Sequence, residues 1–299
     1  MKKIISLLLT ILSIMSCCVC KNNTNKKISK NKNTSVAYDW QLQNFNIPNI
    51  WQKTKGENVT IAVIDSGIDY SLLGENFNFS RILTTYNAYD CNSDMTDFTQ
   101  HGTAIISIIG ANGEDGFYGV APLCNFVIIK ALNERGTTNS ETLVRAINFA
   151  IKNKVDIINL SLGSTNVNES VSYAISTAVK NNIIVTGAVG DQRQNSILFP
   201  AMLSDVLSVA AIDCNGNLYS ESNFSKKVDV LAPGVDVKVP KFNVMHEKLA
   251  TLRSGSSIAT AFFTGVLALY VSYHPKYDIK ELYSIFRNNA AVDIVDLFS

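Results

Sequence analysis

Short runs of aliphatic and β-branched residues alternate along this chain with longer segments in which apolar residues recur at helical spacing. The runs lie at residues 59–64, 126–130, 157–160, 183–185 and 206–209, and the helical segments at residues 142–152 and 170–180. Near-continuous apolar strands that alternate with helices are typical of a parallel sheet with both faces covered. The pattern predicts an α/β fold with three layers, in which helices flank a central, mostly parallel sheet.

Two more segments, residues 104–109 and 258–270, are apolar on nearly every side. A helix that is hydrophobic all round belongs in a protein core. A polar side chain stands just before each segment, His101 before the first and Ser257 before the second. We therefore expect two buried helices, each of which begins next to one of these side chains.

The first 16 residues predict a secretory signal, because two lysines precede an apolar run at residues 4–15. That run is too short to cross a bilayer as a helix, which takes about 20 residues. Residues 14–17 then resemble a bacterial lipoprotein box, in which Cys17 becomes the lipidated N-terminus. The alternative is an ordinary secretory signal that is cut nearby. We expect a protein held on the extracellular face of the bacterial cell membrane by this lipid, or a secreted one.

Residues 17–37 predict a disordered tether. Their polar stretch at 21–35 lacks large apolar groups, and such a segment cannot bury enough surface to offset its chain entropy. Globular sequence begins near residue 38, so we expect one folded domain over residues 38–299.

Composition and charge change this picture little. The chain has 299 residues, a net charge of +1 and 46% hydrophobic residues. These values fit one large apolar core, and a charge near zero gives no reason to expect a nucleic-acid partner. Cys91, Cys124 and Cys214 are scattered and odd in number, so we expect free thiols rather than a disulfide framework or metal ligands.

Three short motifs supply an acid, a base and a nucleophile in that order. Asp65 follows the predicted strand at 59–64, His101 stands in a His-Gly-Thr sequence, and Ser257 in Gly-Ser-Ser-Ile-Ala. In acyl transfer by serine, a carboxylate orients the imidazole, the imidazole accepts the hydroxyl proton, and the oxygen attacks a carbonyl. Each motif alone is weak, since a lone histidine is more often structural and a serine-rich helix start is more often a cap.

Together the motifs resemble those of the subtilisin-like (S8) serine peptidases, in which the order Asp, His, Ser also occurs. The resemblance covers about residues 39–299. It implies a subtilisin-like fold and a serine endopeptidase that acts on a peptide or protein substrate. It assigns catalytic roles to Asp65, His101 and Ser257, whereas Ala261 stands where the family usually has proline.

One departure from the family concerns the oxyanion. Asp191 stands where the family usually has an asparagine whose side-chain amide donates to the oxyanion. An ionised carboxylate can only accept hydrogen bonds, so it would repel that charge. Three possibilities are open: Asp191 is protonated and donates, Gln192 or Asn195 replaces it as a donor, or the enzyme is slow.

The resemblance also implies a substrate groove with two edges. Ser161, Leu162 and Gly163 match the strand that borders the primary pocket and pairs with the peptide backbone, and residues 132–136 match the opposite side. A peptide between two such edges binds as an added strand.

Acidic residues are candidates to lie near this groove, where they would favour a basic peptide: Asp94, Asp97 and Glu134. The alternative is that all three are ordinary solvated loop charges.

The loop at residues 112–116 resembles the place where many members of the family bind calcium. Gly113 falls where an oxygen ligand is often found, so an ordinary turn is the main expectation and calcium the alternative. We expect no cofactor and no other metal.

The size of the chain, its tether and its motifs at 101–103, 111–113 and 119–122 resemble the leader peptidases of lanthipeptide (lantibiotic) bacteriocin clusters. Those enzymes remove the leader from a modified precursor during or after export, so the implied partner is a modified bacteriocin precursor. Two alternatives stay open: a general secreted or surface peptidase, and a degenerate protease that acts as a binding module.

Overall fold

The computed structural model describes residues 39–114, 116–288 and 297–298. The predicted signal at residues 1–16, the predicted lipidation site Cys17 and the predicted tether at 17–37 lie outside the described residues and stay predictions. The residues from Tyr38 to Ser299 form one compact unit.

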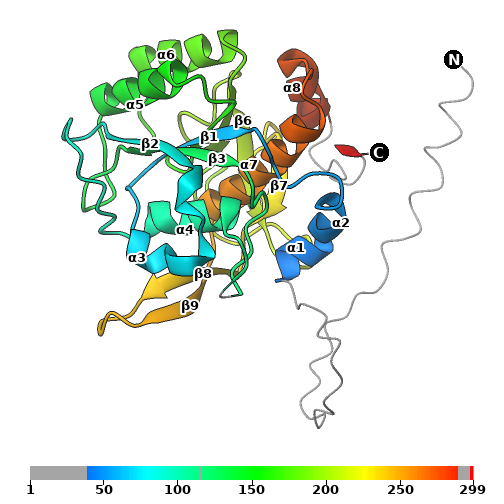
Figure 1. The fold of residues 1–299 in the computed structure, drawn as a ribbon. Coiled ribbons are helices and arrows are strands. Elements are labelled where there is room, and N and C mark those ends of the chain that lie inside the picture. Colours follow the sequence, from blue (N-terminus) through cyan, green and yellow to red (C-terminus); the bar gives the residue numbers. More distant parts are fainter. Residues whose placement is uncertain (1–38, 115, 289–296, 299) are drawn as a thin grey trace, which may run out of the picture. The chain divides into compact units, whose positions relative to one another are not determined.

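A seven-stranded parallel sheet forms the centre of the fold (Figure 1). The strands run in the order β2-β3-β1-β4-β5-β6-β7. Their bounds are β1 (Thr60–Asp65), β2 (Ile82–Asn87), β3 (Asn125–Lys130), β4 (Ile157–Leu160), β5 (Ile184–Ala188), β6 (Leu207–Ile212) and β7 (Val230–Pro233). The predicted α/β fold is confirmed, and each predicted strand overlaps an observed one. The pattern misses the two edge strands, since polar residues interrupt β2 and β7 is very short.

Alternate side chains of the central strands enter two separate cores. In β1, Ile61 and Val63 belong to the core that contains α4 (His101–Gly110) and α7 (Ser256–Tyr273). The intervening Ala62 and Ile64 belong to the core that contains α5 (Ser140–Lys152) and α6 (Glu169–Lys180). Successive residues of a strand point to opposite faces, so these apolar strands hold helices on both sides of the sheet (Figure 1).

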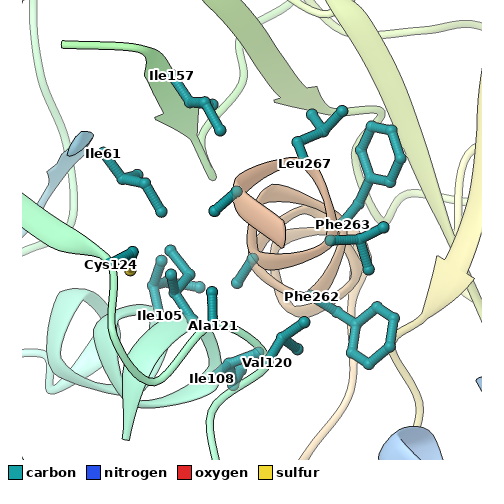
Figure 2. Close-up of a cluster of buried hydrophobic side chains, with 14 of the residues drawn as sticks. Ile61, Ile105, Ile108, Val120, Ala121, Cys124, Ile157, Phe262, Phe263 and Leu267 are labelled. Carbon is teal, nitrogen blue, oxygen red and sulfur yellow. The ribbon is translucent and has the colours of Figure 1, made fainter. Parts of the chain in front are cut away.

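Helix α7 lies at the centre of one of these cores (Figure 2). Phe262, Phe263 and Leu267 project from it, and Ile105 and Val120 are buried nearby. Its 18 residues have the length and apolar composition of a membrane-spanning helix, but 78% of them are buried inside the domain. Such burial is typical of a core helix. The predicted buried helices next to Ser257 and His101 are therefore confirmed.

The remaining elements surround this framework. They are α1 (Trp40–Asn44), α2 (Ile47–Ile50), α3 (Tyr70–Leu73), α8 (Ile279–Asn288), the 3₁₀ turns η2 (Gly74–Asn76) and η3 (Phe79–Arg81), and the strands β8 (Val237–Phe242) and β9 (Lys248–Arg253). β8 and β9 pair as an antiparallel hairpin, and β8 packs against α3 and α4. The chain passes from this hairpin directly into α7.

The cysteines of the described residues form no disulfide. Cys91 and Cys214 are exposed, whereas Cys124 is buried, and its burial raises the pKa of the thiol to about 12. Cys124 therefore behaves as a small apolar core residue.

A buried polar contact joins α7 to the sheet. Thr264 of α7 donates a hydrogen bond to Asn159 Oδ1 on β4 over 2.9 Å, and its oxygen lies 2.8 Å from the hydroxyl of Thr186 on β5. All three side chains are fully buried. A buried polar group that loses its partner costs about 1–3 kcal/mol, so these contacts favour a single placement of α7 along the sheet.

We expect Thr264→Val to lower the free energy of unfolding by about 1–3 kcal/mol, because Asn159 Oδ1 loses this donor. Thr264→Ser is the matched control, since it keeps the hydroxyl and removes one methyl group, at a cost of about 1 kcal/mol. Urea unfolding followed by circular dichroism measures both variants. Equal losses in the two would contradict a role for the hydroxyl.

Candidate active site

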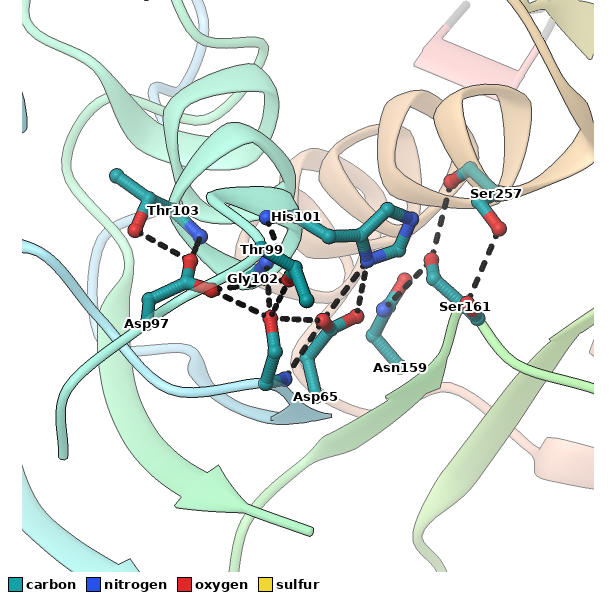
Figure 3. Close-up of polar contacts among 10 residues, drawn as sticks. Asp65, Asp97, Thr99, His101, Gly102, Thr103, Asn159, Ser161 and Ser257 are labelled. Atoms are coloured by element: carbon teal, nitrogen blue, oxygen red, sulfur yellow. Dashed lines mark hydrogen bonds and ion pairs between the residues drawn. The ribbon is translucent and has the colours of Figure 1, made fainter. Parts of the chain in front are cut away.

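Asp65 and His101 are in direct contact at the carboxyl edge of the sheet (Figure 3). Asp65 is the last residue of β1, and His101 is the first residue of α4. His101 Nδ1 lies 2.8 Å from Asp65 Oδ1 and 3.0 Å from Asp65 Oδ2. The side chain of Asp65 is 1% exposed and that of His101 is 26% exposed. The ring therefore uses one nitrogen for the carboxylate and keeps the other for chemistry in the cleft.

A second carboxylate, Asp97, is buried behind this pair. It accepts hydrogen bonds from the backbone N–H and the hydroxyl of Thr103, over 2.8 and 2.7 Å, in the first turn of α4. The Ser66 hydroxyl lies between the two carboxylates, 2.7 Å from Asp97 Oδ1 and 3.0 Å from Asp65 Oδ1. Negative charge is favourable at a helix N-terminus. Asp97 therefore holds the start of α4, and with it the backbone of His101.

Asp97 fits neither of its two sequence interpretations, because it is neither a solvated loop charge nor one of the residues that line the cleft. Its side chain is only 4% exposed and is engaged by Thr103 and Ser66. Asp94 and Glu134, in contrast, line a surface hollow together with Lys130, and Asp94 Oδ2 lies 3.7 Å from Lys130 Nζ. The sequence alone does not distinguish a carboxylate that holds a helix start from one that faces solvent.

Burial and three charged groups set the pKa of His101, and of these groups Asp65 and Asp97 raise it whereas Arg253 lowers it. Burial disfavours the charged ring, but the charge and the hydrogen bond of Asp65 outweigh this effect and raise the pKa above its ordinary value of 6.5. The positive charge of Arg253 acts in the opposite direction to Asp65. His101 is therefore a neutral base only when the pH lies above this raised pKa.

Ser257 lies in the first turn of α7, beside Ser161 (Figure 3). Its hydroxyl donates to the Ser161 carbonyl over 3.0 Å, and the Ser161 hydroxyl donates to the Ser257 carbonyl over 3.0 Å. Within the described residues, no hydrogen bond links Ser257 to His101. Asp65 and His101 thus meet directly, whereas Ser257 needs a rotation about its Cα–Cβ bond to turn its hydroxyl away from Ser161.

The first backbone N–H groups of α7 differ in their partners. Ser256 N–H donates to both carboxylate oxygens of Asp191, over 2.9 and 3.1 Å. Ser257 N–H has no acceptor among the described residues, as expected for the first turn of a helix. Gly255 precedes them with a φ of +149°, and a Cβ there would lie 2.9 Å from Asp191 Oδ2, so this position requires glycine. The free Ser257 N–H can bind developing negative charge.

Asp191 acts as an acceptor in this structure. Besides the Ser256 N–H, its carboxylate accepts from the Ser256 hydroxyl over 3.1 Å. Burial raises the pKa of Asp191, and the hydrogen bonds from Ser256 partly offset this rise. Of the two substitute donors considered from the sequence, Gln192 is engaged by Asn223, whose amide donates to Gln192 Oε1 over 3.0 Å, and Asn195 is exposed.

A cleft of about 570 Å³ opens beside His101. Its lining includes Ser161, Leu162, Gly163, Leu132 and Gly136, which the sequence assigns to the two groove edges. Sequence reasoning misses several other lining residues, which come from five different segments of the chain: Thr99, Thr137, Thr138, Leu143, Ser164, Phe199, Pro200 and Arg253. Closeness in the chain to a predicted site residue is a signal that could have found Thr99, Thr137, Ser164 and Arg253, whereas nothing local points to Phe199 or Pro200.

An aromatic ring packs on the loop at residues 112–116, for which an ordinary turn is the main expectation and calcium the alternative. Asn112 and Tyr118 form an isolated β-bridge, and a Cβ on Gly113 would lie 2.1 Å from the Tyr118 ring. The Asn112 amide donates to the Glu75 carbonyl over 3.0 Å. In the part of the chain that the structure describes, no three His, Cys, Asp or Glu side chains are grouped to hold a metal. Asp115 of this loop lies outside the described residues, so calcium at this place stays the alternative.

Comparisons with known proteins agree on one family. The sequence profile of the subtilase family (peptidase S8) matches residues 56–297. The chain is 33% identical over 242 residues to the "Major intracellular serine protease" of Bacillus subtilis. This match spans 76% of this chain and 72% of that protein. The chain is 30% identical over 265 residues to the "Thermostable alkaline protease" of Halalkalibacterium halodurans, and this match spans 86% of this chain and 70% of that protein. It is also 31% identical over 281 residues to the "Minor extracellular protease Epr" of Bacillus subtilis, and this match spans 91% of this chain and 41% of that protein.

We expect the pKa of the His101 ring to lie above 6.5 in the folded protein and to fall in Asp65→Asn, which removes the negative charge that favours the imidazolium. NMR titration of the histidine rings measures both values. Asp94→Asn is the control, because it removes an exposed carboxylate that does not contact the ring. The same His101 pKa in all three proteins would contradict the assigned role of Asp65.

Proposed function

The chain belongs to the subtilase family of serine endopeptidases, and from this premise we propose that it hydrolyses peptide bonds with Asp65, His101 and Ser257. The observation that carries the assignment is the 2.8 Å contact of His101 Nδ1 with Asp65, next to the start of α7 where Ser257 lies. Ser161 connects the two, because it lines the cleft together with His101 and its carbonyl accepts from the Ser257 hydroxyl.

The reaction begins when the Ser257 hydroxyl turns from the Ser161 carbonyl toward His101. His101 Nε2 takes the proton while Ser257 Oγ bonds to the scissile carbonyl carbon, and Asp65 stabilises the imidazolium that forms. His101 then gives this proton to the leaving amine, the C–N bond breaks, and an acyl-enzyme remains. Water attacks the acyl-enzyme by the same two proton transfers, which releases the acid and restores the Ser257 hydroxyl.

Stabilisation of the oxyanion is the weak part of this site. The Ser257 N–H supplies one donor at the positive end of α7. The Asp191 carboxylate supplies none while it is ionised, and its charge opposes that of the oxyanion. We therefore propose a slow enzyme, whose selectivity comes from contacts along an extended substrate.

The substrate that we propose is an exported peptide precursor, and the lanthipeptide precursor is the class that the sequence motifs favour. Support comes from the cleft, in which Ser161–Gly163 and Leu132–Gly136 form two edges for an extended chain. A general peptidase is the second candidate, favoured by relatives whose names mention no leader removal.

We also propose that the enzyme works outside the cell, held by a lipid on Cys17 or released by an ordinary signal. Support comes from the charged, apolar and cysteine-containing pattern of residues 2–17. Metabolic labelling with a fatty-acid probe tests the lipid: label on the wild type and none on Cys17→Ser is the expected result, and equal label would contradict it.

Labelling with a fluorophosphonate probe tests the catalytic assignment. We expect one label on Ser257, none on Ser257→Ala, and undiminished labelling of Ser256→Thr, which keeps a hydroxyl at the neighbouring position. The labelling rate should rise with pH as His101 loses its proton. Absence of label on the folded wild type at every pH would favour the binding module instead.

Digestion of a modified lanthipeptide precursor and of casein, followed by mass spectrometry, tests the substrate. We expect one cleavage between leader and core and little cleavage of casein. Extensive casein cleavage without preference for the leader junction would favour the general peptidase.

We expect Asp191→Asn to raise kcat by about 10- to 100-fold, because an amide can donate to the oxyanion. Removing such a donor costs about 10²–10³-fold, a figure that was measured on a subtilisin. Below the raised pKa of Asp191 the native side chain carries its own O–H donor, so the gain should grow as the pH rises through that pKa. Glu169→Gln, which removes a carboxylate from α6, is the control. An unchanged or lower kcat in Asp191→Asn would contradict the proposed effect of its charge.

A further inference from the structure

Arg253 places a guanidinium in the substrate cleft. It is the last residue of β9, and it lines the cleft together with His101 and Ser161. Its side chain is partly exposed, and no hydrogen bond or ion pair to it occurs among the described residues. A guanidinium has five N–H donors in a fixed fork that matches a carboxylate. Arg253 therefore has its full binding capacity available to a ligand.

Arg253 belongs to the hairpin of β8 and β9. β8 of the hairpin packs against α3 and α4, and Lys248 Nζ of β9 donates to the Leu73 carbonyl over 3.2 Å. The cleft that Arg253 lines is also lined by His101, by Ser161–Gly163, which follow β4, and by Phe199 with Pro200.

This arrangement assigns a direction to a bound peptide. The acyl half of the substrate pairs with Ser161–Gly163, and the leaving amine must approach His101 to receive its proton. The residues after the scissile bond therefore continue past His101, which lines the same cleft as Arg253 and is close enough to feel its positive charge.

Arg253 also acts on the catalytic ring through its charge. After burial and the larger effect of Asp65, the positive charge of Arg253 lowers the pKa of His101. The other charged groups that face this ring are Asp65 and Asp97, and both are already paired. The imidazolium of the transition state thus forms near an unpaired cation. A substrate carboxylate bound to Arg253 offsets that repulsion, and does so most strongly in the transition state.

We propose that Arg253 selects peptides that carry an acidic side chain on the leaving-group side, at the first or second residue after the scissile bond. The proposal rests on the proposed peptidase function and adds a substrate class to it. Glu or Asp at this place forms a charge-assisted, two-pronged contact with the guanidinium. Because the contact strengthens in the transition state, the acidic residue raises kcat as well as lowering KM.

Fluorogenic peptides with one common acyl half test this inference. They carry Glu, Gln or Lys at the first or the second residue after the scissile bond. We expect the wild type to hydrolyse the Glu peptide about 10-fold better than the Gln peptide in kcat/KM, and the Lys peptide worst. Arg253→Gln should reduce the Glu/Gln ratio to about 1, and Arg253→Glu should favour the Lys peptide. Lys241→Gln, an exposed lysine of β8 outside the cleft, should leave the ratio as in the wild type.

The outcomes separate this inference from the peptidase function. If the wild type hydrolyses the peptides and Ser257→Ala does not, the peptidase function is upheld whatever the Glu/Gln ratio. Fluorophosphonate labelling of Arg253→Gln shows that this variant is folded. A wild-type ratio near 1, or a ratio that survives in Arg253→Gln, would overturn the role of Arg253. A preference for acid only in the acyl half, tested with a second peptide series, would overturn its placement on the leaving-group side.

Discussion

The burial of α7 is the constraint on which the rest of this structure depends. The helix is apolar on nearly all sides, so the core that surrounds it fixes its position as a rigid body. Thr264 then selects one placement along the sheet through Asn159, whose amide also donates to the Ser161 hydroxyl over 3.0 Å. That hydroxyl binds the Ser257 carbonyl. A continuous chain of hydrogen bonds thus connects the middle of α7 to Ser257, the proposed nucleophile, at its start.

The acid and the base are held by the same means at the start of α4. Two carboxylates, Asp65 and Asp97, are buried close together, which is tolerated because each accepts from N–H or O–H groups. Ser66 lies between them, and it also accepts the Gly102 N–H over 2.9 Å. The histidine therefore stands on a first helical turn that several hydrogen bonds hold in place. Catalytic geometry in this protein follows from the anchoring of two helix N-termini at one edge of the sheet.

Two charged side chains, Asp191 and Arg253, set the electrostatics around the proposed catalytic residues. Asp191 brings a negative charge to the place where the oxyanion develops, and it holds the Ser256 N–H at the start of α7. Arg253 brings a positive charge to the His101 side of the cleft. Electrostatic effects of this kind are strong where water is excluded. In the proposed function, the family fold and the Asp65–His101 pair set the reaction, whereas Asp191 and Arg253 adjust its rate and its substrates.

The sequence by itself determined the α/β fold, because β1 and its neighbours are apolar enough to need cover on both faces. It also singled out Asp65, His101 and Ser257, because short motifs keep each side chain next to a strand end or a helix start. Only the tertiary structure decided that Asp97 is buried, that the Ser257 hydroxyl faces Ser161, and that Arg253 enters the cleft. These features depend on contacts between segments far apart in the chain. Local periodicity records which face of an element is buried, but it does not record which partner that face meets.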